Sequence, residues 1–174
     1  MTDLMTERLV LRPMCTDYLD STHEYASDPE TCKYMVFLPN DTTAETLGYL
    51  KRAEKEFAKD NPAFYEMAVF LGDTHIGAVS LYLNDARTEG ELGWTINKRY
   101  QGCGYACEAA KALIKYAAGV LGIKHFIAHC DTENAPSRRV MEKLGMTLKD
   151  EYGGRKNKLS EEERREYLFR LDHD

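Results

Sequence analysis

The chain has 174 residues, of which 43% are hydrophobic and 30% are charged. This length and balance predict one globular domain over residues 1–174, with a core that needs no disulfide. The formal net charge of −6 argues against nucleic acid or an anionic membrane as the main partner, and it is compatible with a cationic amine substrate.

The five cysteines are odd in number and are not spaced like zinc ligands. Cys103 and Cys107 are four residues apart, but no second pair and no histidine cluster accompanies them. We therefore expect free thiols in a reducing cytoplasm and no metal site. Residues 1–12 mix charges with short apolar steps and do not read as a signal peptide, and the apolar runs are too short to span a membrane.

The first third of the chain predicts one strand followed by helices. Alternating apolar residues indicate a strand at Thr6–Pro13, and apolar residues at helical spacing indicate a helix at Asp17–Ser27. Glu30–Met35 could hold a short second helix. The apolar run Met35–Pro39 is either core or the wall of a substrate cleft, and its composition favours core. A capping-box pattern that starts at Thr42 predicts a helix from Thr43 to about Lys59.

From Phe64 the hydrophobic period changes to that of a strand. Phe64–Leu71 and His75–Leu83 predict two strands joined by a turn at Gly72-Asp73. A third strand, Glu91–Ile96, follows a polar turn. These segments predict an antiparallel meander that leads into a loop rich in glycine.

That loop, called the glycine loop below, is Gln101-Gly102-Cys103-Gly104-Tyr105-Ala106-Cys107. Two glycines in three residues let the backbone turn tightly and leave its N–H groups uncovered. Apolar residues at steps of three and four then predict a helix that runs to Leu121 and ends at Gly122. The positive end of the helix dipole would point back at the loop, so the segment is typical of a phosphate site.

Two common phosphate loops do not match this segment. A P-loop requires a Gly-Lys-Ser/Thr string, which the chain does not contain. A dinucleotide-binding fingerprint requires a third glycine where Cys107 stands, and its first glycine directly follows a strand. An ordinary strand-to-helix turn without a ligand is the remaining alternative.

The last third predicts another strand and helix, followed by a closing hairpin. A right-handed crossover through the long helix should place the strand His125–Cys130 parallel to Glu91–Ile96. A helix is predicted at Asn134–Leu144, with Asn134 as the cap. Two closing strands are expected to flank Gly153–Arg165, a mobile and solvated loop. The closing strands are Thr147–Tyr152 and Glu166–Leu171.

Several of these segments resemble the GNAT family of acetyl-CoA-dependent N-acetyltransferases, and in particular its RimJ/RimL-type ribosomal-protein N-terminal acetyltransferases. The likeness covers nearly the whole chain. It implies an α+β, three-layer fold with helices on both faces of a mixed central sheet, whose fourth and fifth strands splay apart. The segments that carry it are Thr6-Glu7-Arg8-Leu9-Val10-Leu11-Arg12-Pro13, Glu91-Leu92-Gly93-Trp94-Thr95-Ile96, the loop pattern Gln101-x-x-Gly104-x-Ala106, and the helix from Asn134 to Gly145.

The resemblance implies that acetyl-CoA is the co-substrate. In the family the fourth strand bulges and its free backbone groups pair with the pantetheine arm, a position that Trp94, Thr95 and Ile96 match. Asn134 would hydrogen-bond the far arm, although its role as a helix cap explains it nearly as well. The pyrophosphate would bind the backbone N–H groups of Gln101, Gly102, Cys103, Gly104, Tyr105, Ala106 and Cys107.

Acetyl transfer from a thioester to an amine requires a neutral amine, a stabilised oxyanion and protonation of the leaving thiolate. Glu91 is the candidate general base, and an exposed strand carboxylate or a substrate anchor explains it equally well. Many GNAT enzymes use a tyrosine acid where this chain has Met141. Ser137 matches the serine proposed for that role in RimL-type enzymes. A thiol that leaves near neutral pH needs no strong acid.

We therefore expect an N-acetyltransferase that moves the acetyl group directly to a primary amine. The resemblance suggests that the acceptor is a protein N-terminal amine. The net negative charge of the chain suggests instead a small amine such as a polyamine, an amino acid derivative or an antibiotic. The missing tyrosine motivates a third alternative, a non-catalytic acyl-CoA-binding module. The resemblance also suggests a homodimer through the closing strands.

Overall fold

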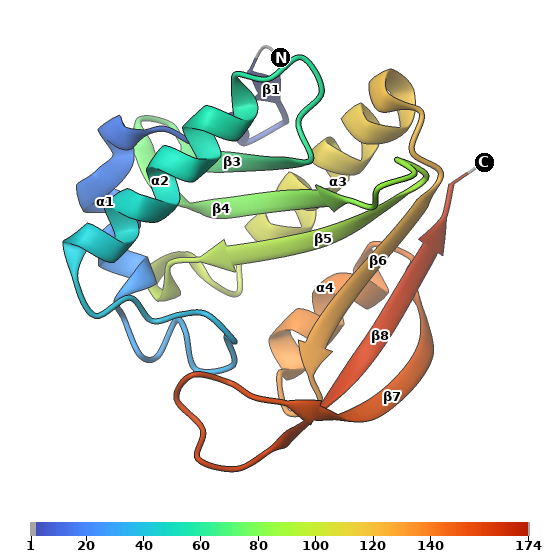
Figure 1. The fold of residues 1–174 in the computed structure, drawn as a ribbon. Helices are drawn as coiled ribbons and strands as arrows, with labels where there is room; N and C mark the ends of the chain where they lie inside the picture. Colours follow the sequence, from blue (N-terminus) through green and yellow to red (C-terminus); the bar gives the residue numbers. More distant parts are fainter. Residues whose placement is uncertain (1–2, 174) are drawn as a thin grey trace.

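Side chains that alternate along the central strands give the sheet two apolar faces, and helices cover both (Figure 1). The computed structural model describes residues 3–173. The strands are β1 (Leu4–Met5), β2 (Leu9–Pro13), β3 (Phe64–Leu71), β4 (Thr74–Leu83), β5 (Glu89–Ile96), β6 (His125–Asp131), β7 (Thr147–Arg155) and β8 (Arg164–Asp172). The helices are α1 (Leu19–Ala26), α2 (Thr43–Phe57), α3 (Tyr105–Tyr116) and α4 (Ala135–Lys143), and short helical turns η1 (Thr16–Tyr18), η2 (Lys98–Tyr100) and η3 (Ala117–Leu121) adjoin them.

Within residues 3–173 the strands form one eight-stranded sheet in the order β1-β2-β3-β4-β5-β6-β8-β7. Neighbouring strands are antiparallel except β5 and β6, which are parallel and connected through α3. The predicted meander and the predicted parallel crossover are therefore confirmed. β7 forms an edge of the sheet, and a homodimer through the closing strands stays a prediction.

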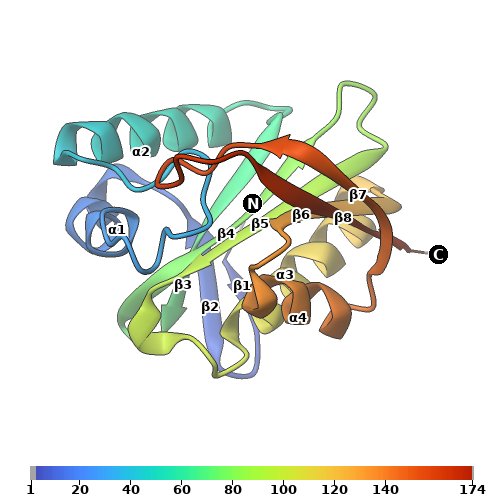
Figure 2. The ribbon, with the colours of Figure 1, turned by 90° about the horizontal axis from the view of Figure 1, so that it is seen from below.

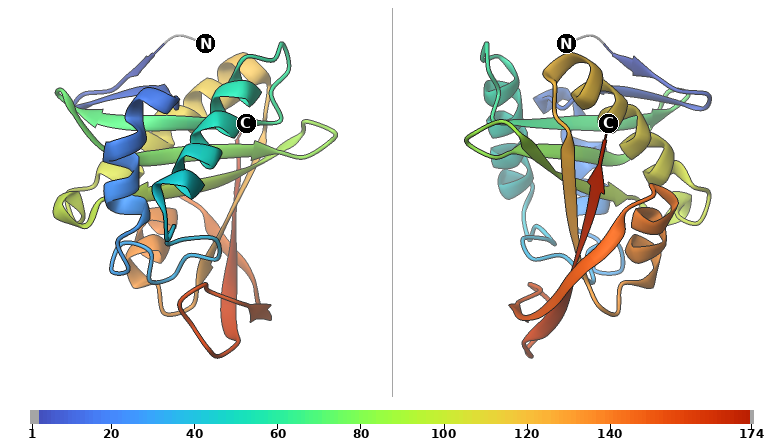
Figure 3. Two further views of the ribbon diagram at one scale, coloured as in Figure 1. Left: turned by 60° about the vertical axis from the view of Figure 1, so that its left-hand side comes forward. Right: turned by 90° about the vertical axis from the view of Figure 1, so that its right-hand side faces the viewer.

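The two faces of the sheet carry separate clusters of buried side chains. Met67 and Val69 of β3 pack with Leu113 of α3 on one face. Ala68 and Phe70 of the same strand pack with α1 and α2 on the other. One strand therefore serves both cores because its side chains alternate. Figure 3 shows the resulting layers, with α1 and α2 on one side of the sheet and α3 and α4 on the other, which confirms the three-layer α+β fold.

The parallel pair of β5 and β6 is short. Register partners run only from Glu89 and His125 to Glu91 and Ile127. Beyond Glu91, β5 stays paired with β4 as far as Ile96, while β6 stays paired with β8. Figure 1 shows the two arrows diverging toward their carboxyl ends. The predicted splay of these strands is therefore confirmed.

The bulge expected in β5 is absent from its pairing with β4. The β4–β5 register runs without a shift from Gly77 and Ile96 to Leu83 and Gly90. The irregularity lies instead between Val69 and Phe70 of β3. The carboxyl end of β5 leaves β6 as an unbroken strand, because it remains fully bonded to β4.

Of two predictions for residues 30–39, one is wrong and one is correct only in part. Glu30–Met35 forms turns and no helix, because Asp28 Oδ2 accepts hydrogen bonds from both the backbone N and the hydroxyl of Thr31, at 3.0 and 2.7 Å. The apolar run Met35–Pro39 is core only at its end, where Leu38 packs against the cluster beneath α1 and α2 and Pro39 is buried. Phe37 has 86% of its surface exposed. This run also lines the cleft described below.

The close approach of β4 to the end of β5 depends on Gly77. A Cβ at this position would lie 2.9 Å from Ile96 Cα and still closer to the Thr95 carbonyl oxygen. Both obstacles are backbone, so the strands would have to separate. The absence of a side chain at Gly77 therefore allows β4 to stay paired with the part of β5 that has separated from β6.

We expect Gly77→Ala to lower the free energy of unfolding by about 1–3 kcal/mol, since the added methyl group forces a backbone shift. Urea denaturation at equilibrium measures the change. Gly119→Ala is the matched control, because a Cβ at Gly119 would have nothing within 4 Å and helical alanine is about 1 kcal/mol better than glycine. Equal stability of Gly77→Ala and wild type would contradict this account.

Candidate functional site

A cleft of about 1250 Å³ opens where β5 and β6 diverge. It collects residues from the carboxyl end of β5, the glycine loop and the first turn of α4. Cys103 is the one predicted site residue outside the lining. The other predicted residues line the cleft: Glu91, Trp94, Thr95, Ile96, Gln101, Gly102, Gly104, Tyr105, Ala106, Cys107, Asn134 and Ser137.

The glycine loop turns because two of its residues adopt left-handed backbone angles. Gly102 has φ 79° and Gly104 has φ 84°. Gly104 is also the N-cap of α3, so the helix begins directly at the cleft. The first N–H groups of a helix have no partner within it, and the residues that carry them here, Tyr105, Ala106 and Cys107, line the cleft. Gln101 Nε2 donates to the Ile96 carbonyl at 2.8 Å and joins the loop to the end of β5.

The N-terminal segment braces the same loop. Arg8 donates from Nη1 to the Cys103 carbonyl at 3.1 Å, and its guanidinium lies 4.6 Å from the centre of the Tyr105 ring. Glu108 of α3 accepts from the Thr6 hydroxyl at 2.6 Å and from Arg8 Nε at 2.7 Å. Burial raises the pKa of Glu108, but the hydrogen bonds from Thr6 and Arg8 outweigh it and the pKa is lowered. The Thr6–Arg8 motif thus holds the start of α3.

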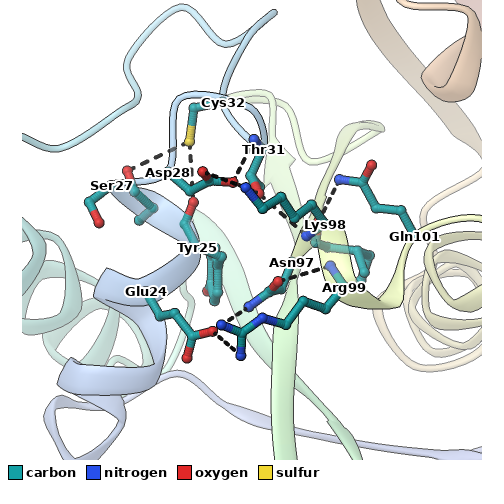
Figure 4. Close-up of polar contacts among 12 residues, drawn as sticks. Glu24, Tyr25, Ser27, Asp28, Thr31, Cys32, Asn97, Lys98, Arg99 and Gln101 are labelled. Carbon is teal, nitrogen blue, oxygen red and sulfur yellow. Dashed lines mark hydrogen bonds and ion pairs between the residues drawn. The ribbon is translucent and has the colours of Figure 1, made fainter.

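A second set of contacts connects the turn after β5 to α1 and the loop that follows it (Figure 4). Asn97 Nδ2 donates to Glu24 Oε1 at 3.1 Å, and Arg99 forms an ion pair with the same carboxylate at 3.1 Å. Lys98 Nζ lies 3.2 Å from Asp28 Oδ1. Sequence patterns could not reveal these pairs, because their partners are about seventy residues apart. The glycine loop and the α1 side of the cleft are consequently fixed to one another.

On the α4 side, Asn134 acts as the helix cap. Its Oδ1 accepts from the Ser137 backbone N at 3.2 Å. Within residues 3–173 the Ser137 hydroxyl has no hydrogen-bond partner, and it is half-buried at the cleft. Met141, one turn further on, is fully buried in the core. Ser137 is therefore the α4 hydroxyl available to a bound molecule.

Glu91 lies on β5 at the last register position shared with β6, opposite Tyr82 of β4. Its side chain is exposed and lines the cleft. Alternation along β5 puts it on the same face as Gly93 and Thr95, which is the face covered by α1 and α2. The carboxylate is thus on the side of the sheet opposite α3.

The wall formed by β6, β7 and β8 contributes polar groups that the predicted site did not include. His129 Nδ1 lies 2.8 Å from the Tyr152 hydroxyl and 3.4 Å from Glu166 Oε1. Arg155 forms an ion pair with Glu166. Burial and the neighbouring Glu166 raise the pKa of Tyr152 to about 12. His129, Arg155 and Glu166 all line the cleft.

The segment Gly153–Arg165 is only in part the predicted mobile, solvated loop, because most of its residues are exposed but it is tied to the rest of the fold. β7 and β8 extend into it, and Asn157 is buried, with its Nδ2 2.6 Å from Asp131 Oδ2. Asp131 also accepts from Arg164 Nε at 3.0 Å. The segment is held at its base by a buried carboxylate.

The same segment crosses the cleft to residues 34–41, and these contacts are called the bridge below (Figure 2). Arg155 Nη2 donates to the Tyr34 carbonyl at 2.8 Å. Lys158 donates from its backbone N to the Met35 carbonyl at 2.9 Å and from Nζ to the Pro39 carbonyl at 2.7 Å. The bridge covers one side of the cleft with hydrogen-bonded backbone.

The floor of the cleft beneath α2 contains a buried carboxylate, Glu66 of β3. Its oxygens accept hydrogen bonds from the hydroxyls of Tyr49, at 2.8 Å, and of Tyr82. Burial raises the pKa of Glu66 to about 7, although the tyrosine hydrogen bonds lower it. The alternation of apolar and polar residues along β3 predicts that Glu66 faces solvent. Glu66 is buried because α2 packs against this face of the sheet.

We predict that Glu66 makes stability depend on pH. Its carboxyl ordinarily titrates at 4.5 but retains its proton to about 7 in the folded chain. Between these values the unfolded state has lost a proton that the folded state keeps, so stability falls as pH rises. The unfolding free energy of wild type should drop by roughly 3 kcal/mol relative to Glu66→Gln between pH 4.5 and 8. Denaturation at a series of pH values measures it, and a constant difference would contradict the assignment.

Within the described residues, no group of three or more His, Cys, Asp or Glu side chains is arranged to hold a metal ion. No helix in residues 3–173 combines the length and apolar character needed to cross a bilayer.

Comparisons with known proteins agree on the family. The model of the acetyltransferase (GNAT) domain matches residues 8–147. The uncharacterized N-acetyltransferase YnaD of Bacillus subtilis is 32% identical over 146 residues, which cover 82% of this chain and 81% of that protein. A GNAT-family acetyltransferase from Bacillus anthracis superposes with a TM-score of 0.84 at 27% identity, over 98% of each chain. RimL, a ribosomal α-N-protein acetyltransferase in complex with coenzyme A, superposes with a TM-score of 0.85 at 15% identity, over 99% of each chain. The chain therefore belongs to the GNAT family and is an N-acetyltransferase.

Proposed function

We propose that the cleft binds acetyl-CoA between the splayed strands and transfers its acetyl group directly to a primary amine that enters beneath α1 and α2. The observation that carries this proposal is the early end of the β5–β6 pairing at Glu91 and Ile127, beside the glycine loop. Acetyl-CoA supplies an activated thioester. The chain supplies the groups that bind and orient both reactants.

The backbone of β5 suits the pantetheine arm. Trp94, Thr95 and Ile96 are paired with β4 on one side but lie beyond the last partner in β6 on the other. Backbone groups of this segment that point away from β4 have no partner in β6, so an extended amide-containing chain could pair with them as a strand would. A backbone N–H in this range is also the candidate donor to the developing oxyanion.

The glycine loop suits the pyrophosphate. Its N–H groups and the N-terminus of α3 converge on one side of the cleft, which is the usual arrangement for an anion. Arg8 points to the outer side of the loop, where its contacts with Cys103 and Glu108 hold the backbone in place. Cys103 lies outside the cleft lining, and its carbonyl accepts the hydrogen bond from Arg8 that braces the loop.

Glu91 and Ser137 are the proposed proton-transfer residues. They lie on different elements that line the cleft, β5 and α4. Glu91 would take a proton from the ammonium group of the acceptor, directly or through water, because only the neutral amine attacks a thioester. The Ser137 hydroxyl, which has no partner within residues 3–173, would donate to the leaving thiolate.

The bridge favours a small amine as the acceptor. Hydrogen bonds from Arg155 and Lys158 to residues 34–39 span one side of the cleft, so an extended polypeptide would have to displace them. A protein N-terminal amine is the second candidate, because the neighbour RimL is described as a ribosomal α-N-protein acetyltransferase.

Thiol release from acetyl-CoA tests the function. The purified protein would be offered polyamines, aminoglycosides and amino acid derivatives beside peptides with free Ala or Ser termini. We expect release with small amines, a loss of about a hundredfold in kcat/KM for Glu91→Gln and about tenfold for Ser137→Ala. Asp85→Asn, in an exposed loop outside the cleft, is the control.

If thiol is released from acetyl-CoA only with the peptides, the acceptor would be a protein N-terminal amine and not a small amine. Coenzyme A binding without release on any amine, and without an effect of Glu91→Gln, would support a non-catalytic acyl-CoA-binding module and refute the proposal.

The loop assignment predicts a specific defect in Gly104→Ala. An alanine at φ 84° is strained whatever the free space, and relief of that strain would turn the first N–H groups of α3 away from the cleft. We expect the KM for acetyl-CoA to rise about tenfold. Gly122→Ala is the matched control, because Gly122 has φ 73° at the far end of the same helical segment. Equal KM values for the two variants would exclude a role of the loop in binding.

A further inference from the structure

Among residues 3–173, one fully buried side-chain hydroxyl at the cleft has no hydrogen-bond partner. Tyr25 of α1 is 3% exposed, and its Oη is a buried side-chain oxygen that has no hydrogen-bond partner within residues 3–173. Tyr25 nevertheless lines the cleft. A buried hydroxyl without a partner is costly and uncommon, and such a group is explained when a ligand supplies the partner.

The unpaired hydroxyl belongs to a cluster around Glu66. Tyr25 and Tyr49 pack in the same cluster of buried side chains beneath α1 and α2. Burial raises the pKa of both hydroxyls, and the neighbouring Glu66 raises it further. Tyr49 and Tyr82 donate their hydroxyls to the Glu66 carboxylate. All four side chains line the cleft, beneath α1 and α2. This cluster of Tyr25, Tyr49, Glu66 and Tyr82 is called the tyrosine–carboxylate subsite.

The subsite and the reacting end of the cleft are connected along one face of the sheet. Glu66, Ser80 and Gly93 are successive register partners on β3, β4 and β5. Neighbouring strands lie about 4.8 Å apart, so Glu66 is roughly 10 Å from the β5 backbone that would hold the thioester. The two register partners along this path, Ser80 and Gly93, have small side chains, and a Cβ on Gly93 would be 2.5 Å from Ser80 Oγ.

We propose that the tyrosine–carboxylate subsite binds a second, positively charged group of the acceptor, so that the substrate is a diamine or polyamine held at both ends. This inference rests on the proposed function and adds the class of acceptor to it. An ammonium group has three donors, which match the Tyr25 hydroxyl oxygen and the Glu66 carboxylate. The three tyrosines of the subsite line the same cleft, and aromatic rings can attract cations. The other nitrogen would then reach Glu91 and the thioester.

The cations of the bridge do not compete for this carboxylate. Arg155 is paired with Glu166, and Lys158 is paired with Asp41. Both side chains also donate hydrogen bonds to the segment between α1 and α2, at the carbonyls of Tyr34 and Pro39.

The subsite also predicts how binding depends on pH. Glu66 in the free protein keeps its proton to about pH 7, and a neutral carboxyl attracts a cation weakly. A bound ammonium favours the ionised form, so affinity for the diamine should increase as pH rises through 7. The titratable or charged groups near Glu66 are Tyr25 of α1, Tyr49 and Arg52 of α2, Tyr82 of β4 and Glu91 of β5.

Calorimetric titration tests the inference without turnover. Hexamethylenediamine and hexylamine would be titrated into the protein in the presence of coenzyme A, which cannot donate an acetyl group. We expect the diamine to bind at least tenfold more tightly at pH 8, and the preference to shrink at pH 6. Equal affinity for the two amines at pH 8 would overturn the inference.

Two variants separate binding from folding. Glu66→Gln should remove the preference for the diamine, and Tyr25→Phe should reduce it about tenfold. Because the Tyr25 hydroxyl has no partner in residues 3–173, Tyr25→Phe should keep or raise the Tm. Tyr116→Phe, on the α3 side of the sheet and outside the cleft lining, is the control. A Tyr25→Phe protein that keeps the full preference would refute the subsite.

The subsite and the proposed acetyl transfer can be refuted independently of each other. Tight diamine binding without thiol release would refute the transferase assignment for this acceptor and support the subsite. Efficient acetylation of monoamines without any preference for diamines would support the function and refute the subsite.

Discussion

The structure depends on β5 leaving β6 while remaining bonded to β4. A parallel pair that continued beyond Glu91 and Ile127 would close the sheet and leave no cleft. The close approach at Gly77 keeps the free end of β5 in an unbroken ladder, so the strand presents its other edge to the cleft without fraying. The glycine loop follows directly and opens α3 at the same place. The early end of the pairing between β5 and β6 thus creates the cleft and the exposed backbone edge of β5. It also places the glycine loop at one end of the cleft.

Periodicity and turn chemistry predicted most of the fold, because these signals are local. The meander of β3, β4 and β5, the crossover through α3 and the helix after Asn134 all follow from alternation, helical spacing and capping residues. The glycine loop was also recognisable, since left-handed angles at Gly102 and Gly104 require glycine. The sequence-predicted residues, Cys103 excepted, lie around one cleft because this fold brings the end of β5 and the start of α3 together.

The errors came from contacts between distant parts of the chain. The segment Gly153–Arg165 is rich in charge and looks solvated, but Asn157 is buried against Asp131 and Lys158 bonds to Met35 and Pro39. Residues 35–39 look like core, yet the bridge uses their backbone and leaves Phe37 exposed. Glu66 has the alternation of a solvated residue and becomes a floor residue only because α2 packs above it. No local pattern carries information of this kind.

The ion pairs between α1 and the turn after β5 have a thermodynamic consequence. Glu24 and Asp28 hold Asn97, Lys98 and Arg99, which precede the glycine loop by only a few residues. A molecule that moves α1 when it occupies the amine side must also disturb the backbone donors on the nucleotide side. Such a molecule would couple the occupancy of the two halves, and by linkage each ligand would change the affinity of the other by the same factor.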